Sequence, residues 1–298
     1  MISKALDKNP FREALLKNKP LLLDGAMGSY LQQKGFETDD ILWTTNIIFA
    51  NPEAVIKIHS EYIESGADII TTNTFRTNPA TLETAGLKDY KNYVRQAVLL
   101  AQEASTNHNV QIAGSNAPAE DCYQVERTLN KQKLELNHKK HIDLLIDNQV
   151  DFILNETQSH FDEIQIICDH SEKNNIPYAV SLYFNESLSI LSGESIEFIL
   201  SFLKDYNPRA VGFNCIQPML LTKLIGSIAL PVNWGYYLNC GSGNPTDHII
   251  ECGISPNDYH TVVKNLMKYN PVFIGSCCGS NPAHTKKIRD YLDGKYSS

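Results

Sequence analysis

The sequence predicts an α/β protein with the architecture of a (β/α)8 TIM barrel, formed as a single domain over residues 1–298. Three observations lead to this prediction. Short apolar runs recur along the chain, stretches with helical periodicity separate them, and the alternation repeats about eight times, which is the number of units that closes such a barrel. A chain of 298 residues with 42% hydrophobic content is long enough to bury one core of that size.

Eight short runs rich in apolar and β-branched residues are predicted to form the strands. In chain order they are Leu21–Asp24, Asp68–Thr72, Val110–Gly114, Asp151–Glu156, Tyr178–Phe184, Ala210–Cys215, Val232–Leu238 and Val272–Cys277. Buried parallel strands read as nearly continuous hydrophobic runs, and strands that alternate with helices indicate βαβ units. The pattern therefore favours parallel strands with helices around them.

The segments between these runs are predicted to be helical where they carry an apolar face. A clear case is Pro52–Ser65, which Gly66 is expected to terminate. The face of this helix that should be buried carries Val55, Ile58, His59 and Tyr62. The exception is Ser115–Asn137, which is rich in charged and amide side chains. We expect an extended loop there, with a partial helix near its end, and a place at the active site.

Charge and the N-terminal residues exclude several classes of partner. The chain has 26 Lys and Arg residues against 34 Asp and Glu residues, a formal net charge of -8, so it lacks the basic surface that binding to a nucleic-acid backbone needs. Its first residues contain neither the apolar core of a signal peptide nor a membrane-spanning run. We therefore expect a cytoplasmic protein that binds small molecules, with no nucleic acid and no membrane as partner.

Polar residues stand where most of the predicted strands end. The carboxyl ends of the strands form the active-site face of a (β/α)8 barrel, so these residues are candidates for function. In chain order they are Asp24, Gly25, Thr72, Asn73, Thr74, Ser115, Asn116, Asn155, Glu156, Thr157, Asn214, Cys215, Asn239, Cys277 and Cys278.

Three of these strand-end residues are thiols, since Cys215 closes the sixth run and Cys277 and Cys278 close the eighth. Seven cysteines in a chain without an export signal indicate reduced thiols. Catalytic zinc sites typically keep three protein ligands and a fourth position for water or substrate, and thiolates select zinc. The sequence therefore predicts Zn2+ on these three cysteines. The alternative is a core cysteine and an accidental pair, against which their place at two strand ends argues.

Two acidic residues at strand ends, Asp24 and Glu156, are candidates for binding a substrate amino group. A buried carboxylate is costly unless it meets a cation or hydrogen-bond donors. The alternative for each is a nearby Lys or Arg, or simple solvation. Gly25 lacks a Cβ, so its backbone N–H can approach a ligand carboxylate closely.

Five short motifs at the predicted strand ends resemble a known family. They are DGAMG after the first strand, TTNTF after the second, NET after the fourth, GFNC after the sixth and GSCCG after the eighth. Together, over nearly the whole chain, they resemble the homocysteine S-methyltransferase family. The single cysteine followed by the Cys-Cys pair is the specific part of this resemblance.

The resemblance implies a (β/α)8 barrel enzyme that methylates the thiol of homocysteine to give methionine. It implies Zn2+ on the three cysteines with the homocysteine sulfur as the fourth ligand, and no catalytic residue beyond the zinc-activated substrate thiolate. It also implies that the amino-acid end of homocysteine is held by Asp24, Gly25 and Glu156, with Thr74 and Asn239 close by.

The methyl donor is predicted from chain length and from one departure. The family often shows a glycine-proline element after the third strand, whereas this chain has SNAP, from Ser115, and then EDCYQVERTL, from Glu120. We expect the donor to bind there. The short single-domain chain favours a sulfonium, S-methylmethionine or S-adenosylmethionine, with betaine as the alternative, because folate or cobalamin donors ordinarily need additional domains. Aromatic residues near the strand ends are available to face an onium methyl or simply to pack: Tyr123, Trp234, Tyr236 and Tyr237.

Two rival interpretations remain. An aldolase or phosphate-binding isomerase on the same barrel would place a lysine or a glycine-rich phosphate turn after the late strands, where this chain has Asn239 and the Cys277 and Cys278 pair. A non-catalytic barrel that binds zinc and homocysteine would keep the same residues, because a fold does not imply turnover.

Overall fold

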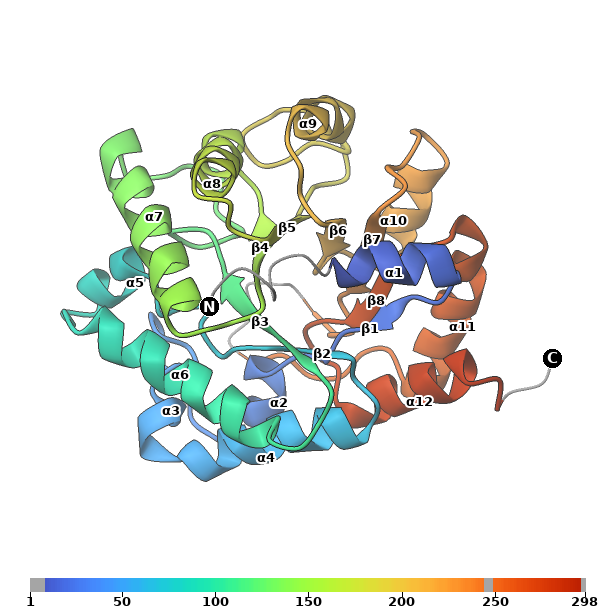
Figure 1. Cartoon of the computed structure of the whole chain (residues 1–298), viewed down its shortest axis with the longest axis horizontal. Coiled ribbons are helices and arrows are strands. Elements are labelled where there is room, and N and C mark those ends of the chain that lie inside the picture. The colour runs from blue at the N-terminus through green and yellow to red at the C-terminus, as the bar shows by residue number, and fades with distance from the viewer. Residues whose placement is uncertain (1–8, 244–248, 296–298) are drawn as a thin grey trace.

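In residues 9–243 and 249–295, which the computed structural model describes, eight parallel strands form a barrel with helices around it (Figure 1). The order around the sheet is β1-β8-β7-β6-β5-β4-β3-β2, and a parallel bridge between Leu23 and Ile69 joins β1 to β2. The predicted (β/α)8 barrel is thus confirmed. The strands are β1 (Leu21–Leu22), β2 (Ile69–Thr71), β3 (Gln111–Asn116), β4 (Phe152–Gln158), β5 (Tyr178–Leu182), β6 (Val211–Asn214), β7 (Trp234–Leu238) and β8 (Phe273–Ser276).

Several of the helices begin at a proline, whose missing N–H is not needed in the first helical turn. Among the described residues no helix has both the length and the apolar character to cross a membrane. The helices are α1 (Pro10–Lys17), α2 (Gly28–Gln33), α3 (Ile47–Ala50), α4 (Pro52–Glu64), α5 (Pro79–Thr84), α6 (Tyr90–Ala104), α7 (Lys131–Asp147), α8 (Phe161–Lys173), α9 (Ile196–Phe202), α10 (Pro218–Ile225), α11 (Pro256–Leu266) and α12 (Pro282–Leu292), with 3-10 turns η1 (Leu203–Asp205) and η2 (Met267–Tyr269).

The elements agree closely with those predicted from the sequence. Each predicted run overlaps one observed strand, β3 and β4 extend two residues beyond their predicted ends, and α4 buries the predicted face. Most strands are shorter than predicted. The segment Ser115–Asn137 was predicted as an extended loop with a partial helix near its end. Its first two residues instead complete β3, residues 117–130 form a connection without helix or strand, and the predicted helix is the start of α7, from Lys131.

The side chain of Phe11, from α1, fills the amino-terminal end of the barrel. Its ring packs edge-on against the rings of Phe152 and Phe273, each at a centroid distance of 5.5 Å. Gly235 on β7 leaves room for this layer, since a Cβ there would lie 2.3 Å from the Phe273 ring. With the amino-terminal end packed, the carboxyl-terminal end of the barrel is the end that can receive a ligand.

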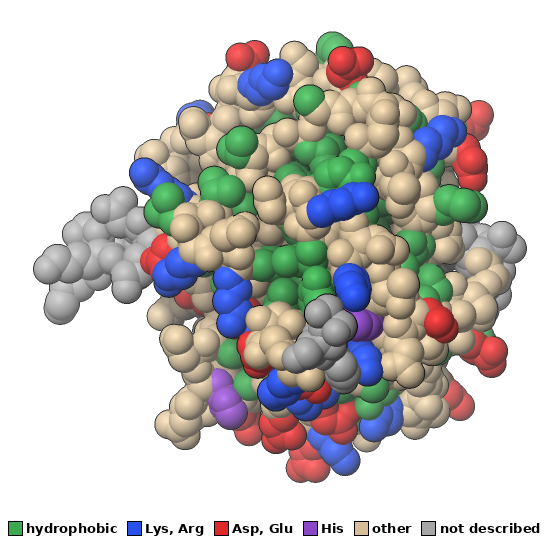
Figure 2. All heavy atoms as spheres, turned by 90° about the vertical axis from the view of Figure 1, so that its right-hand side faces the viewer, with side chains coloured by type: hydrophobic (Ala, Val, Ile, Leu, Met, Phe, Trp, Pro, Cys, Tyr) green, Lys and Arg blue, Asp and Glu red, His purple; other side chains and the backbone are tan. Residues whose placement is uncertain are grey.

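One face of the molecule carries a mixed pattern of charge (Figure 2). Lys and Arg side chains there lie among Asp and Glu side chains, around a central region where apolar side chains gather. The basic groups on this face are thus interspersed with acidic ones rather than collected into one patch.

A buried carboxylate anchors the connection 117–130 to the barrel. Glu163, in the first turn of α8, accepts hydrogen bonds from the backbone N–H of Ala119 (2.8 Å) and from Nε2 of His138 (2.6 Å), and Arg127 lies 3.3 Å from it. Burial alone would raise the pKa of Glu163, but these partners, His138 foremost, lower it to about 2. The connection is therefore held by a carboxylate that stays ionised at neutral pH.

Replacing Glu163 by Gln should lower the free energy of unfolding by about 2 to 3 kcal/mol, because charge-assisted hydrogen bonds to a buried group are lost. The folded-state pKa lies below the ordinary value of 4.5, so the contribution is present above about pH 4.5 and is lost as the pH falls towards 2. Urea unfolding at pH 7 and pH 3 should thus show a smaller difference between wild type and variant at pH 3.

The matched control for this prediction is Asp162→Asn. Asp162 also pairs with Arg127, but its side chain is 39% exposed, so its loss should cost less than about 1 kcal/mol. Equal losses of unfolding free energy in the two variants would contradict the role of Glu163 as the anchor of the connection 117–130.

Candidate metal centre and ligand cavity

A cavity of about 260 Å3 lies at the carboxyl-terminal end of the barrel. Its lining comes from strand ends, from the chain after α2 and from the connection 117–130. Small-molecule sites commonly start at about 300 Å3, so this cavity suits ligands of amino-acid size. It brings together six of the eight residues predicted to bind the metal or homocysteine: Asp24, Gly25, Glu156, Cys215, Cys277 and Cys278.

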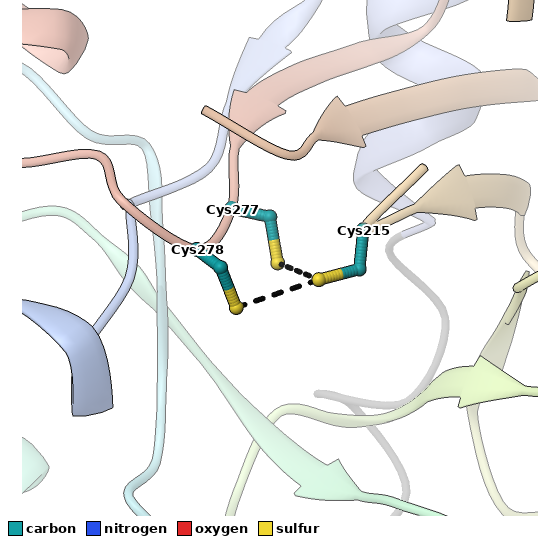
Figure 3. A group of neighbouring side chains, drawn as sticks. All are labelled: Cys215, Cys277 and Cys278. Carbon is teal, nitrogen blue, oxygen red and sulfur yellow. Dashed lines mark hydrogen bonds between the residues drawn. The ribbon is translucent and has the colours of Figure 1, made fainter. Parts of the chain in front are cut away.

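The three predicted cysteine thiols face one another in this cavity (Figure 3). Sγ of Cys215 lies 3.2 Å from Sγ of Cys277 and 3.4 Å from Sγ of Cys278, and all three sulfurs fall within 4.8 Å of one another. Tetrahedral zinc with Zn–S bonds of about 2.3 Å separates two sulfur ligands by about 3.8 Å. The sulfur separations are close to that value, so the donor set fits one metal ion.

Strand β7 positions both cysteine-bearing segments. The N–H of Cys215 donates to the carbonyl of Tyr237 (3.1 Å), and the N–H of Cys277 donates to the carbonyl of Leu238 (2.7 Å). Cys215 has a φ of 57°, in the left-handed region that a residue other than glycine adopts at a cost of about 1 to 3 kcal/mol. Such strain is found where a side chain must be aimed, and here it accompanies the approach of Cys215 to the other two thiols.

The hydroxyl of Tyr123, from the connection 117–130, donates a hydrogen bond to Sγ of Cys215 (3.1 Å). Hydrogen bonds from Cys277 and Cys278, and also the one from Tyr123, lower the pKa of the Cys215 thiol against the effect of burial. Cys122 lines the same cavity and is buried, but it is not part of the three-thiol cluster. The sulfur of Cys215 is thus the point on which these donors converge.

Two predicted carboxyl groups line the cavity. Glu156 accepts hydrogen bonds from the hydroxyls of Ser115 and Tyr237, and Asp24 accepts from the N–H (2.8 Å) and the hydroxyl of Thr71. Burial raises the pKa of Glu156 to about 7 and raises that of Asp24 well above its ordinary value. Within residues 9–243 and 249–295 neither forms a salt bridge with Lys or Arg, so both remain available to a cationic ligand.

Gly25 lines the cavity next to Asp24. A Cβ at this position would lie 2.7 Å from the ring and hydroxyl of Tyr62 and 2.8 Å from Oγ of Ser280. Packing alone therefore requires glycine here, in addition to any close approach of a ligand to the backbone.

The remaining two predicted residues, Thr74 and Asn239, do not line the cavity. The hydroxyl of Thr74 donates to the carbonyl of Ser115 (2.7 Å), and Oδ1 of Asn239 accepts from the N–H of Gly241 (2.6 Å). Both side chains hold the backbone around the cavity.

The aromatic candidates divide in two. Tyr123 and Tyr237 line the cavity, whereas Trp234 and Tyr236 stack on each other (5.8 Å) in the core between the sheet and the helices. The second pair thus follows the packing alternative that the sequence left open. Its cause is position along β7: Trp234 begins the strand, at the end remote from the cavity, and Tyr236 points to the face opposite Tyr237.

The cavity residues that were missed at the level of sequence include Trp43, Phe75 and Arg76. Trp43 lies in the chain between α2 and α3, far from any strand end, and no sequence signal marks it. Its ring meets that of Phe75 edge-on at 6.4 Å. Phe75 and Arg76 directly follow the strand-end residues of β2, so extending the strand-end rule by two residues would have found them.

Fold and cavity together define a (β/α)8 barrel whose open end combines a three-thiol metal-binding cluster with carboxyl and aromatic groups. A family model described as homocysteine S-methyltransferase matches residues 21–292, and the chain therefore belongs to the homocysteine S-methyltransferase family. The family resemblance and the methyltransferase class predicted from the motifs are confirmed.

Individual relatives match over nearly their whole length. Homocysteine S-methyltransferase of Escherichia coli (strain K12) is 27% identical over 94% of this chain and 98% of that protein. Homocysteine S-methyltransferase 3 of Zea mays is 25% identical over 92% of this chain and 90% of that protein. Among solved structures, the metallated form of the homocysteine methyltransferase MmuM from Escherichia coli has a TM-score of 0.79 at 24% identity, covering 95% of this chain and 99% of that chain. The last similarity supports the fold.

Purified protein should carry about one metal ion per chain, bound by the three-thiol cluster. Changing Cys277 and Cys278 together to Ala should remove the ion, because one thiolate cannot hold it alone. The matched control is Cys122→Ala, which deletes a buried thiol of the same cavity and should leave the metal content intact. Elemental analysis of the folded proteins decides the matter, and full occupancy in the double variant would place the metal elsewhere.

Proposed function

We propose that this protein uses Zn2+ bound to Cys215, Cys277 and Cys278 to transfer a methyl group from a sulfonium donor, S-methylmethionine or S-adenosylmethionine, to the thiol of homocysteine, giving methionine. The observation that carries the proposal is the convergence of three thiols and Glu156 in one cavity of amino-acid size. Membership of the family supports homocysteine as the acceptor.

In this proposal the carboxyl groups and Gly25 bind the amino-acid end of homocysteine. An ammonium group beside Glu156 favours the ionised carboxylate and lowers its pKa, which burial has raised to about 7. Asp24 supplies a second acceptor, and the N–H of Gly25 can meet the homocysteine carboxylate because no Cβ shields it. Thr74 and Asn239 contribute by fixing the surrounding backbone through Ser115 and Gly241.

Bound Zn2+ would supply the acceptor sulfur as a thiolate, the nucleophilic form. That sulfur attacks the methyl carbon in line with the bond to the donor sulfur. A new S–CH3 bond forms as the donor bond breaks, and the released electron pair stays on the donor sulfur, which becomes a neutral thioether. The chain's contribution is to hold both ligands in one cavity, which removes much of the entropic cost of their encounter.

The cavity lining favours a cationic donor. Acidic and aromatic side chains attract an onium centre through charge and through ring quadrupoles, and the connection expected to bind the donor supplies part of this lining. A volume of about 260 Å3 suits S-methylmethionine better than the bulkier S-adenosylmethionine. Betaine is the alternative, since its ammonium centre is also a cation. The residues concerned are Asp39, Asp40, Trp43, Phe75, Asp121 and Tyr123.

The test is a turnover assay with zinc-loaded protein, homocysteine and each donor in turn. Methionine should form with S-methylmethionine, and X-ray absorption at the zinc edge should show the sulfur ligands rising from three to four when homocysteine is added. A rise to four sulfurs without methionine from any donor would identify a non-catalytic homocysteine-binding barrel. A sulfur count that stays at three would contradict the proposal that zinc binds the homocysteine sulfur.

Glu156→Gln should weaken homocysteine binding about ten- to a hundredfold at neutral pH and leave the metal in place, because a charge-assisted hydrogen bond is lost. Since the pKa of Glu156 is about 7 in the free protein, protons compete with the ammonium group at lower pH. The difference between wild type and variant should therefore narrow as the pH falls from 8 to 6. Titration calorimetry at several pH values measures it.

The matched control for Glu156→Gln is Glu120→Gln. Glu120 lies on the connection 117–130 and accepts from the N–H groups of Thr128 and Leu129 outside the cavity, so its change should leave homocysteine affinity as in the wild type. An unchanged affinity in Glu156→Gln would remove Glu156 from the site.

A further inference from the structure

Arg76 is the one Lys or Arg side chain among the described residues that line the cavity. It lies just beyond the end of β2, between Phe75 and Thr77. The charged side chains that share the lining with it are all carboxylic acids: Asp24, Asp39, Asp40, Asp121 and Glu156. A lining that is otherwise acidic thus contains one Lys or Arg side chain, which is suited to an anion.

The guanidinium of Arg76 is held in a fixed orientation. Its Nη2 lies 3.1 Å from Oδ2 of Asp121, its Nη1 donates to the carbonyl of Glu120 (3.4 Å), and the group stands 5.5 Å from the centre of the Phe75 ring. The Arg76 side chain is 18% exposed. A guanidinium has five N–H donors in a planar fork, so these two acceptors leave it able to bind a further carboxylate.

The same contacts connect Arg76 to the metal-binding cluster. Oδ1 of Asp121 accepts from the N–H of Tyr123 (2.8 Å), and the hydroxyl of Tyr123 donates to Sγ of Cys215 (3.1 Å). The connection 117–130 thereby ties the guanidinium and the thiols to one short segment, with the rings of Phe75 and Tyr123 in the same cavity. Arg76, these rings and the three sulfurs therefore line one cavity, which a single ligand can share.

We propose that Arg76 is a specificity-determining residue that binds a carboxylate of the methyl donor, so that the enzyme selects onium donors bearing a carboxylate over those without one. This inference rests on the proposed methyl transfer. A planar, bidentate Arg–carboxylate pair is among the stronger polar contacts in proteins. Arg76 would fix the donor at the end remote from its reacting methyl group, while the acidic and aromatic lining receives the cation.

The test compares two donors that differ in one group: S-methylmethionine and (3-aminopropyl)dimethylsulfonium, which lacks the carboxylate. Calorimetry in the absence of homocysteine measures binding without turnover. Wild-type protein should bind S-methylmethionine about ten- to a hundredfold more tightly than the decarboxylated compound, and in Arg76→Gln this ratio should fall to within about threefold of one. The kcat/KM values with homocysteine should show the same loss of preference, chiefly through KM.

Asp121→Asn separates recognition from a purely structural role. This variant loses the ion pair that ties Arg76 to the connection 117–130 but keeps the guanidinium, so the preference for the carboxylate donor should persist. A preference that survives in Arg76→Gln, that is absent from the wild type, or that is lost equally in Asp121→Asn would overturn the inference. Absence of methionine with either donor, together with an Arg76-dependent binding preference, would instead contradict methyl transfer and retain the carboxylate site.

Discussion

Strand β7 is the constraint on which the three-thiol cluster depends. Neighbouring strands lie about 4.8 Å apart, so the backbones of β6 and β8, on either side of β7, are about 10 Å apart. If both chains continued straight beyond their strands, their side chains would be too far apart to bind one ion. The carbonyls of Tyr237 and Leu238 accept hydrogen bonds from the N–H groups of Cys215 and Cys277. These bonds hold the segments that follow β6 and β8 close to the end of β7. The left-handed backbone at Cys215 is the local cost of that turn.

The connection 117–130 extends this arrangement from the metal centre to the entrance of the cavity. Two sets of contacts anchor this connection. Glu163 of α8 binds Ala119 and Arg127, and the hydroxyl of Tyr123 donates a hydrogen bond to Sγ of Cys215. Because a segment without regular structure makes few backbone hydrogen bonds of its own, these side-chain contacts fix its path. A disturbance at Glu163 would therefore be transmitted to the hydrogen bond on Sγ of Cys215, although Glu163 itself does not line the cavity.

Sequence reasoning succeeded where regular structure carries the site and failed where irregular chain does. Hydrophobic runs locate strand ends, and strand ends located the three thiols, Asp24 and Glu156. The same reasoning could not tell which strand-end side chains point into the cavity, because successive side chains along a strand point to opposite faces and an error of one residue reverses the direction. Thr74 is such a case, since its hydroxyl bonds to the backbone beside the cavity. Trp43 comes from a connection whose path no periodicity encodes, and only tertiary packing brings it to the cavity.

Excess negative charge is the property that selects the ligands of this cavity. Glu156, Asp24 and the three cysteines lie in one cavity, where their ionised forms would repel one another, and burial has already raised the pKa of both carboxyl groups. Each cation that enters relieves part of this repulsion, whether a metal ion, an ammonium group or an onium centre. The proposed methyl transfer would cancel one such pair of charges, because the substrate thiolate and the sulfonium would both become neutral thioethers. A neutral thioether is a weaker metal ligand than a thiolate. The electrostatic attraction that would bind the reactants would therefore bind the products less tightly.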